Sequence, residues 1–318
     1  MQCEYNEQPA SSEGDTSVAK LKRLACAREN GASEPHQRIN YIEGWRKIVG
    51  VPTRDPAAER DRVEVWLGPV QTLADSGYSE ILSANELLAL DQIRSPALRN
   101  RKLAGRALLR TALSHVMSWR ISPREWQIYP DANGRPRIAK SMPQINFSIS
   151  YAEPVVVVAV SEKLSVGIDV ETVEDTTEDQ ITAFCCSCEQ DFLDGGSASQ
   201  NSREFIRLWT LKEAYTKLVG LGHGVDFDSI GFSLDSLHLL HGASVQTKDR
   251  NVHFETMWVT SGRALNHVAI AIDFSSSARA SAELQVMSMS NPDKSASAIH
   301  VPNVNILAQA NPLGSARQ

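Results

Sequence analysis

The sequence predicts an α+β protein of two similar lobes, each a small antiparallel sheet packed with helices. Two observations favour this fold class. Strand-like and helix-like segments recur in the same order at a spacing of about one hundred residues. The chain has 318 residues, 42% hydrophobic and 22% charged, which is an ordinary globular composition with length enough for two units. Two such pseudo-symmetric lobes would leave a cleft between them, where we expect the active site.

The first copy contains both predicted helices and predicted strands. Ser83 and Glu86 form a capping-box pattern, which indicates the start of an apolar helix. In order, we expect a strand at 63–67, the capped helix, a long helix over about 99–117, short strands near 126–129 and 138, and an alternating, then apolar, segment over 146–160.

The second copy repeats this order. We expect a strand at 166–171, a helical region at 182–193, a helix at 205–219, and strands at 230–234, 253–259 and 267–272. The glycines of 220–224 follow a helix rather than a strand, so they indicate a helix-terminating turn and not a dinucleotide-binding loop.

The two ends of the chain lack periodic apolar residues. We therefore expect a mobile N-terminal tail at 1–61, lobes at 62–163 and 164–274, and a mobile C-terminal tail at 275–318, because neither end offers enough apolar surface to offset the entropy of ordering it.

Composition excludes several classes of protein. The net charge of −6 argues against a nucleic-acid coat. The longest apolar run, Val155–Val160, is far shorter than the roughly 20 residues of a membrane span. The N-terminus lacks the basic start and apolar core of a secretory signal, and five cysteines without disulfide-framework spacing favour a reducing compartment. We expect a cytoplasmic protein that binds neither nucleic acid nor membrane.

Two carboxylates lie two residues apart on the predicted strand at 166–171. Side chains alternate along a strand, so Asp169 and Glu171 project together while Ile168 and Val170 face the other side. Their repulsion would be relieved by a divalent cation, and Mg²⁺ prefers one or two carboxylates with substrate phosphates. An exposed edge strand with two acidic residues is the alternative.

Glu213 and Lys217 lie one turn apart on the predicted helix at 205–219, so they share a face. They could serve as an acid and base pair, or they could simply be a common pair that stabilises an exposed helix.

The long helix of the first copy is basic. Arg101 falls in line with its apolar stripe, where an unpaired cation is costly and a phosphate would be a suitable partner. The other cations share one narrow sector, which indicates a solvated face that could attract an acidic partner: Arg99, Lys102, Arg106 and Arg110. Arg135 in a turn and Ser150 at a strand end add further polar groups.

Four segments together resemble the 4′-phosphopantetheinyl transferases of the two-lobed, surfactin-synthetase-activator type. They are Gly134–Pro136, Asn146–Ser150, Val166–Glu171 and Trp209–Lys217. The resemblance covers about 62–274 and excludes both tails. It implies transfer of the phosphopantetheine arm of coenzyme A to a serine of an acyl or peptidyl carrier protein, with release of adenosine 3′,5′-bisphosphate.

The resemblance also implies roles for residues. Asp169, Glu171 and Glu213 would hold Mg²⁺, Glu213 would be the general base, and Lys217 would assist the leaving group. The remaining matched positions would contact coenzyme A: Arg101, Arg135, Ser150, Tyr151 and Lys212. The form of the last motif is similar to the broad-specificity branch, which favours secondary metabolism, and we expect a monomer.

One position departs from the family pattern. Relatives commonly carry His where this chain has Tyr151, and a phenol has no positive charge, so we expect weaker binding of coenzyme A. Two alternatives remain open: a coenzyme A- or carrier-binding protein with little turnover, and a Mg²⁺-dependent pyrophosphate hydrolase that uses water as the nucleophile.

Overall fold

The structure, a computed structural model, describes residues 61–75, 77–132, 134–221, 225–235, 237–241, 251–277, 281–289 and 306–309. These residues belong to one compact unit, Arg46–Gln318. Apart from Asp61, the predicted N-terminal tail lies outside the described residues, as do 222–224 of the predicted turn.

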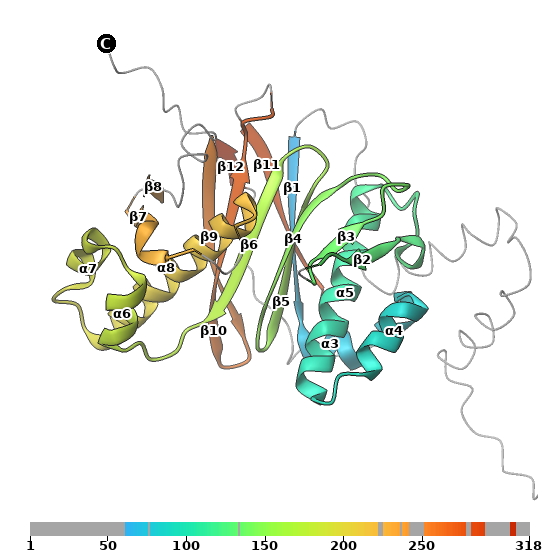
Figure 1. Cartoon of the computed structure of the whole chain (residues 1–318), viewed down its shortest axis with the longest axis horizontal. Helices are drawn as coiled ribbons and strands as arrows, with labels where there is room; N and C mark the ends of the chain where they lie inside the picture. The colour runs from blue at the N-terminus through green and yellow to red at the C-terminus, as the bar shows by residue number, and fades with distance from the viewer. Residues whose placement is uncertain are drawn as a thin grey trace, which may run out of the picture. The chain divides into compact units, whose positions relative to one another are not determined.

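The first lobe has one strand, a group of helices and then a hairpin (Figure 1). Its main elements are β1 (Asp61–Pro69), α3 (Val70–Asp75), α4 (Ala84–Asp91), α5 (Pro96–Val116), β4 (Asn146–Ala152) and β5 (Val155–Ser161). β5 lies between β4 and β1 and is antiparallel to both. The hydrophobic run predicted at 146–160 therefore forms two adjacent strands.

The second lobe repeats this topology. Its main elements are β6 (Ser165–Thr172), α6 (Glu178–Phe184), α7 (Ser187–Leu193), α8 (Ala198–Val219), β9 (Val252–Ser261) and β10 (Ala264–Asp273). β10 lies between β9 and β6 and is antiparallel to both, as β5 is to β4 and β1. The prediction of an α+β fold with two similar lobes is confirmed.

Shorter elements connect the main ones. They are the 3₁₀ helices Tyr78–Ile81, Pro123–Glu125 and Phe227–Ser229, the strand pair β2 (Ile128–Pro130) and β3 (Pro136–Ile138), and the strand pair β7 (Gly231–Ser233) and β8 (His238–His241).

The C-terminal segment corrects the predicted boundary at 275. β11 (Ser281–Ser288) pairs in parallel with β1, and β12 (Ile306–Gln309) pairs with β11, which gives the sheet order β12-β11-β1-β5-β4. Ala282 and Leu284 are buried in the core, so the alternation of apolar and polar residues from 282 to 286 is a strand pattern. A mobile tail is therefore wrong for these two strands.

One hydrophobic core joins the two sheets. It contains alternate residues of β1, β5, β6 and β10, such as Val65, Val157, Ile168 and Ile270. The other face of β10 packs with α8 in a second cluster that includes Ala269, and helices thus cover the outer faces of both sheets (Figure 1). Packing on both faces explains why β5 is apolar at nearly every position.

The helix ends follow the sequence signals. The side chains of Ser83 and Glu86 form the predicted capping box of α4, and Gly220 ends α8 with a positive φ of 78°.

The predicted solvated face of α5 is wrong for Arg110, which is fully buried. Its guanidinium pairs with Glu86 at 2.6 Å and donates to the carbonyl of Pro123. Within the described part of the chain, no helix combines the length and apolar character that crossing a membrane requires.

Candidate active site

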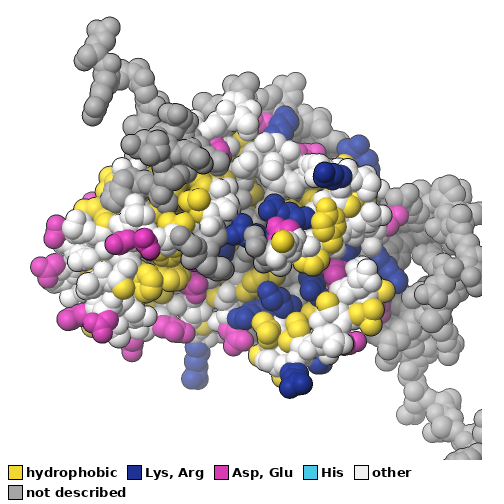
Figure 2. Space-filling model, viewed as in Figure 1, with side chains coloured by type: hydrophobic (Ala, Val, Ile, Leu, Met, Phe, Trp, Pro, Cys, Tyr) yellow, Lys and Arg dark blue, Asp and Glu magenta, His cyan; other side chains and the backbone are white. Residues whose placement is uncertain are grey.

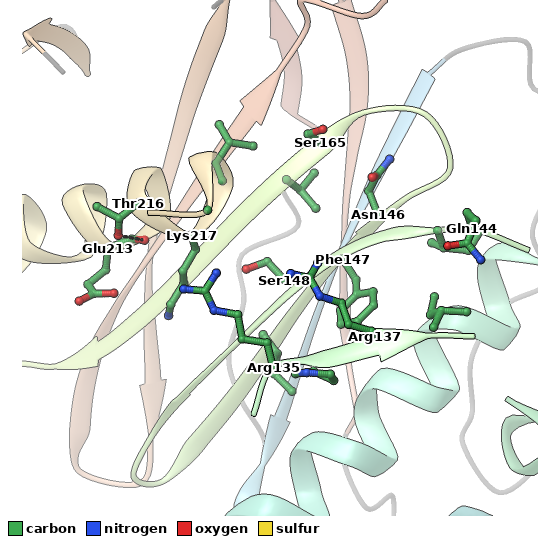
Figure 3. A pocket seen from close by; sticks show the side chains of 17 residues that line it. Arg135, Arg137, Gln144, Asn146, Phe147, Ser148, Ser165, Glu213, Thr216 and Lys217 are labelled. Atoms are coloured by element: carbon green, nitrogen blue, oxygen red, sulfur yellow. Dashed lines mark hydrogen bonds between the residues drawn. The ribbon is translucent and has the colours of Figure 1, made fainter. Parts of the chain in front are cut away.

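A pocket of about 540 Å³ lies where the two lobes meet (Figure 3). Its walls come from β3, β4, the start of β6 and the last turns of α8. Glu213 and Lys217 extend from α8 to the same side, as their spacing predicts, and Arg135 reaches towards Lys217 from the opposite wall (Figure 3). The pocket therefore brings side chains of both lobes together.

Asp169 lies on β6 with its side chain towards α8. Ile168 and Val170 on either side of it are fully buried in the shared core, so the predicted alternation of the strand is confirmed. Gly167 lets α8 come close, because a Cβ at that position would collide with the carbonyl oxygen of Ala214 and lie 2.7 Å from the backbone nitrogen of Leu218.

Asp169 and Lys217 form an ion pair across this contact. The ammonium of Lys217 lies 2.5 Å from Oδ1 of Asp169 and donates to the hydroxyl of Ser150, which itself donates to the same carboxylate at 2.7 Å. Burial raises the pKa of Asp169, while Lys217 and Ser150 lower it. Ser150 belongs to the first lobe, so this cluster crosses the boundary between the lobes.

Glu171 lies within the same electrostatic cluster. Its pKa is raised to about 7, chiefly by burial and then by the charge of Asp169, with a smaller contribution from Glu213. Lys217 and a hydrogen bond from Trp209 act in the opposite direction. Glu171 therefore interacts electrostatically with both other predicted carboxylates and with Lys217.

A cation would fit the chemistry of this cluster. Oδ2 of Asp169 is buried without a hydrogen-bond partner, and the charges of Asp169 and Glu213 raise the pKa of Glu171. In this structure, however, the described residues contain no group of three His, Cys, Asp or Glu side chains that is arranged to hold a metal ion. Lys217 neutralises Asp169 instead, so the shared Mg²⁺ site stays a proposal.

Two predicted phosphate contacts come from different elements of the first lobe. Arg135 lines the pocket and follows Gly134, whose positive φ of 75° forms the turn. Arg101 lies on α5, partly buried, close enough to influence the pKa of Tyr151. Figure 2 shows Lys and Arg side chains gathered near the middle of this face, with Asp and Glu more frequent over α6 and α7.

The structure does not place Lys212 at the pocket. This side chain is 1% exposed, and its ammonium donates to Glu189 at 2.6 Å and to the carbonyls of Phe184 and Phe227. These three acceptors use all three of its hydrogens. The predicted contact of Lys212 with coenzyme A is therefore wrong, and the residue holds α7 and the loop before β7 against α8.

Sequence reasoning missed two residues of this region. Trp209 hydrogen-bonds Glu171, and the hydroxyl of Ser148 accepts the backbone N–H of Ile168 across the boundary between the lobes. The alternation of Ser148 and Ser150 on one strand was a signal for the second contact. For Trp209 the signals were its place at the start of the matched segment Trp209–Lys217 and its position one turn before Glu213.

Comparisons with known proteins agree with this geometry. Residues 165–272, which carry Asp169, Glu171, Glu213 and Lys217, match the family described as the 4′-phosphopantetheinyl transferase superfamily. This stretch of the chain is therefore similar to that superfamily. The family resemblance inferred from the sequence motifs is thereby confirmed.

Individual phosphopantetheinyl transferases match a larger part of the chain. The 4′-phosphopantetheinyl transferase HetI of Nostoc is 27% identical over 169 residues, which cover 51% of this chain and 70% of the relative. A 4′-phosphopantetheinyl transferase of Bacillus subtilis is 30% identical over 135 residues, covering 42% and 58%. A human relative, L-aminoadipate-semialdehyde dehydrogenase-phosphopantetheinyl transferase, is 27% identical over 149 residues, covering 43% and 48%. The matches to the last two thus span about half the length of each relative.

Proposed function

We propose that this protein transfers the phosphopantetheine arm of coenzyme A to a serine hydroxyl of an acyl or peptidyl carrier protein. The main support is the cluster of Asp169, Glu171, Glu213 and Lys217 beside a pocket between the lobes, in a stretch of the chain that is similar to this superfamily. In the reaction, the serine oxygen bonds to the phosphorus next to the pantetheine arm. The bond from that phosphorus to the bridging oxygen breaks, which releases adenosine 3′,5′-bisphosphate.

Asp169, Glu171 and Glu213 would hold the Mg²⁺ ion. When bound, Mg²⁺ would offset the charge of the pyrophosphate and help to align it for in-line attack. Once Asp169 binds the metal ion, its carboxylate would no longer require the ammonium of Lys217 as its counter-charge. Lys217 would then be released from Asp169. Its side chain is 29% exposed and lines the pocket, so it can turn towards the substrate.

Glu213 and Lys217 would divide the proton transfers. The carboxylate of Glu213 would accept the proton of the attacking serine, directly or through a water. The ammonium of Lys217 would donate to the departing bisphosphate or stabilise its charge. Arg135, on the opposite wall, would bind the phosphates, and Ser150 would orient Lys217 through the hydrogen bond described above.

The proposal extends to the compartment, the oligomeric state and the carrier proteins. We propose that the protein acts in the cytoplasm as a monomer and that its carriers serve polyketide, nonribosomal peptide or fatty-acid synthesis. The cations near the middle of the face in Figure 2 would attract an acidic carrier.

Intact-mass measurement tests the proposal directly. The protein is mixed with Mg²⁺, coenzyme A and several apo carrier proteins, and we expect a carrier to gain the phosphopantetheine arm at its serine. Glu213→Ala should abolish the gain. Glu204→Ala is the matched control, because Glu204 is also on α8 but pairs with Arg207, and it should retain transfer.

Three outcomes would contradict the proposal. The first is that no carrier gains mass with the unaltered protein. The second is release of adenosine 3′,5′-bisphosphate without any carrier, which would indicate a hydrolase. The third is binding of coenzyme A without turnover, which would indicate a binding protein.

A further inference from the structure

Two cysteine thiols meet at the start of α7. Sγ of Cys186 lies 2.8 Å from Sγ of Cys188, which is only about 1 Å beyond the length of a disulfide bond. Neither thiol is part of a disulfide in this structure. Cys186 is buried, whereas Cys188 is exposed. The pair therefore combines one accessible sulfur with one protected sulfur behind it.

The backbone at Cys186 is fixed by several hydrogen bonds. Its N–H donates to Oε2 of Glu189, and its carbonyl oxygen accepts the N–H groups of Glu189 and Gln190. Glu189 is itself buried, and it accepts hydrogen bonds from the ammonium of Lys212 and the backbone N–H of Phe232. Because these contacts hold the start of α7 in place, the two thiols stay within reach of each other.

Cys188 also lines a small pocket between α7, α8 and the strand pair β7 and β8. The pocket has a volume of about 160 Å³ and is lined largely by apolar side chains, of which Phe192 and Leu240 are exposed. Asp235 lines the same pocket, and Asp191 lies three residues after Cys188, on the same side of α7. A small molecule that reaches Cys188 therefore meets an apolar surface with negative charge beside it.

The two thiols differ in how they can react. Burial, and then the hydrogen bond with Cys188, raise the pKa of Cys186 to about 12, so this sulfur stays protonated at neutral pH. Cys188 is exposed at the pocket, so it is the sulfur that a reagent meets first. Asp and Glu side chains are frequent over α6 and α7 (Figure 2), and their charge disfavours the approach of an anionic reagent.

We propose that Cys186 and Cys188 form a reversible dithiol–disulfide site that reacts with small neutral or cationic disulfides. The inference goes beyond the proposed transfer reaction and does not rest on it, since neither cysteine is among the residues that line the pocket of Glu213 and Lys217.

The oxidation proceeds by two thiol–disulfide exchanges. First, the thiolate of Cys188 attacks one sulfur of the small disulfide, a mixed disulfide forms on Cys188, and one small thiolate leaves. Second, Cys186 loses its proton and attacks Sγ of Cys188, and the other small thiolate leaves. The two departing thiolates take up the two protons of the cysteines. The pair is thus oxidised by two electrons, and the small disulfide is reduced to two thiols.

Peptide mapping of the full chain tests the pairing. The reduced protein is incubated with cystamine, a small cationic disulfide, and its remaining thiols are then alkylated before digestion. We expect the peptide that contains 185–188 to lose two hydrogens and to be alkylated only at Cys185, and dithiothreitol should reverse the loss. Fragmentation of this peptide assigns the pairing in the unaltered protein, so the result does not depend on the folding of any variant.

Three variants test the order of the steps. Cys185→Ala is the matched control and should still form the disulfide. Cys186→Ser should stop at the mixed disulfide on Cys188, because the second sulfur is missing. Cys188→Ser should give neither the disulfide nor an adduct on Cys186. Circular dichroism checks that each variant is folded.

A second reagent tests the preference for charge. Dithiodiglycolate is a small anionic disulfide, and the rate with each reagent is divided by its rate with free glutathione to correct for intrinsic reactivity. We expect cystamine to react about tenfold faster after this correction at low salt, and the ratio should fall at high salt. The double variant Asp191→Asn/Asp235→Asn should also lower it.

Four results would overturn the proposal. They are the absence of the disulfide in the unaltered protein, a disulfide that includes Cys185, an adduct on Cys186 in Cys188→Ser, and equal corrected rates with the two reagents.

Discussion

Two lysines of α8 show how neighbouring positions of one motif serve different purposes. Lys212 is buried and bonded to Glu189 and two carbonyls, whereas Lys217 is partly exposed and shares Asp169 with Ser150. The difference arises from the elements that face each lysine. α7 and the segment before β7 surround the first, and the pocket borders the second.

Lys212→Met should destabilise the fold. The change leaves Glu189 as a buried charge without its partner, which costs about 3–5 kcal/mol of the free energy of unfolding. Urea denaturation measures this loss. The control is Arg137→Met, which breaks an exposed pair with Asp131 and should cost about 0–1 kcal/mol. Equal losses in the two variants would contradict a structural role for Lys212.

Local spacing predicts some site residues and not others. The alternation of a strand was enough to place Asp169 and Glu171 together, and one helical turn was enough for Glu213 and Lys217. The burial of Arg110 and Lys212 depends on acceptors from distant segments, such as Glu86, 24 residues away. The pattern of residues within one helix does not show which distant acceptors will face it. The burial of Arg110 and Lys212 was therefore not predictable from the sequence.

At the scale of elements, the close approach of α8 to β6 places Lys217 beside Asp169. Small residues on the sheet permit it: Gly167 on β6 faces Ala214, and Ala269 and Ala271 of β10 lie in the same cluster as that alanine. The distance between helix and strand therefore controls the geometry of the site.

Gly167→Ala should reduce both stability and transfer. The added methyl group meets backbone atoms of α8 that cannot move alone, and such overpacking costs about 1–3 kcal/mol or more. Thermal unfolding and the transfer rate measure the two effects. Gly77→Ala is the control: its positive φ makes the change cost about 1–2 kcal/mol, but nothing lies within 4 Å of the new atom. The control should keep the transfer rate, and a normal rate in Gly167→Ala would disprove the steric argument.

Element prediction succeeded where a strong local signal was present and failed at the C-terminal strands. The capping box of α4 and the long apolar stretch of β4 and β5 are local features. β11 is a short alternating segment among polar residues, and its partner β1 lies more than two hundred residues earlier in the chain. β11 is a strand because it pairs with β1, and its own hydrophobicity is too weak to predict this.

For the whole molecule, the shared core makes the two lobes one folding unit. Residues of β1, β5, β6, β10 and β11 meet in a single cluster between the sheets. The predicted boundary near 164 therefore separates two similar topologies rather than two independent cores.

Leu284→Ala should reveal that the C-terminal strand supports this core. Leu284 is fully buried, so truncation should cost about 2–5 kcal/mol in the free energy of unfolding. Gln285→Ala alters the next residue, on the other face of β11, and should stay within about 0.5 kcal/mol. Urea denaturation followed by circular dichroism compares them. A negligible change in Leu284→Ala would mean that β11 does not contribute to the core.

Because the core is shared, the stretch that is similar to known proteins does not form this core on its own. The stretch that matches the superfamily, 165–272, supplies one wall of that interior, and the first lobe supplies the other. If residues 165–272 were expressed alone, the apolar inner sides of β6 and β10 would be exposed to water. An exposed apolar surface of this kind favours aggregation. The second lobe therefore depends on the first lobe to cover its apolar inner face.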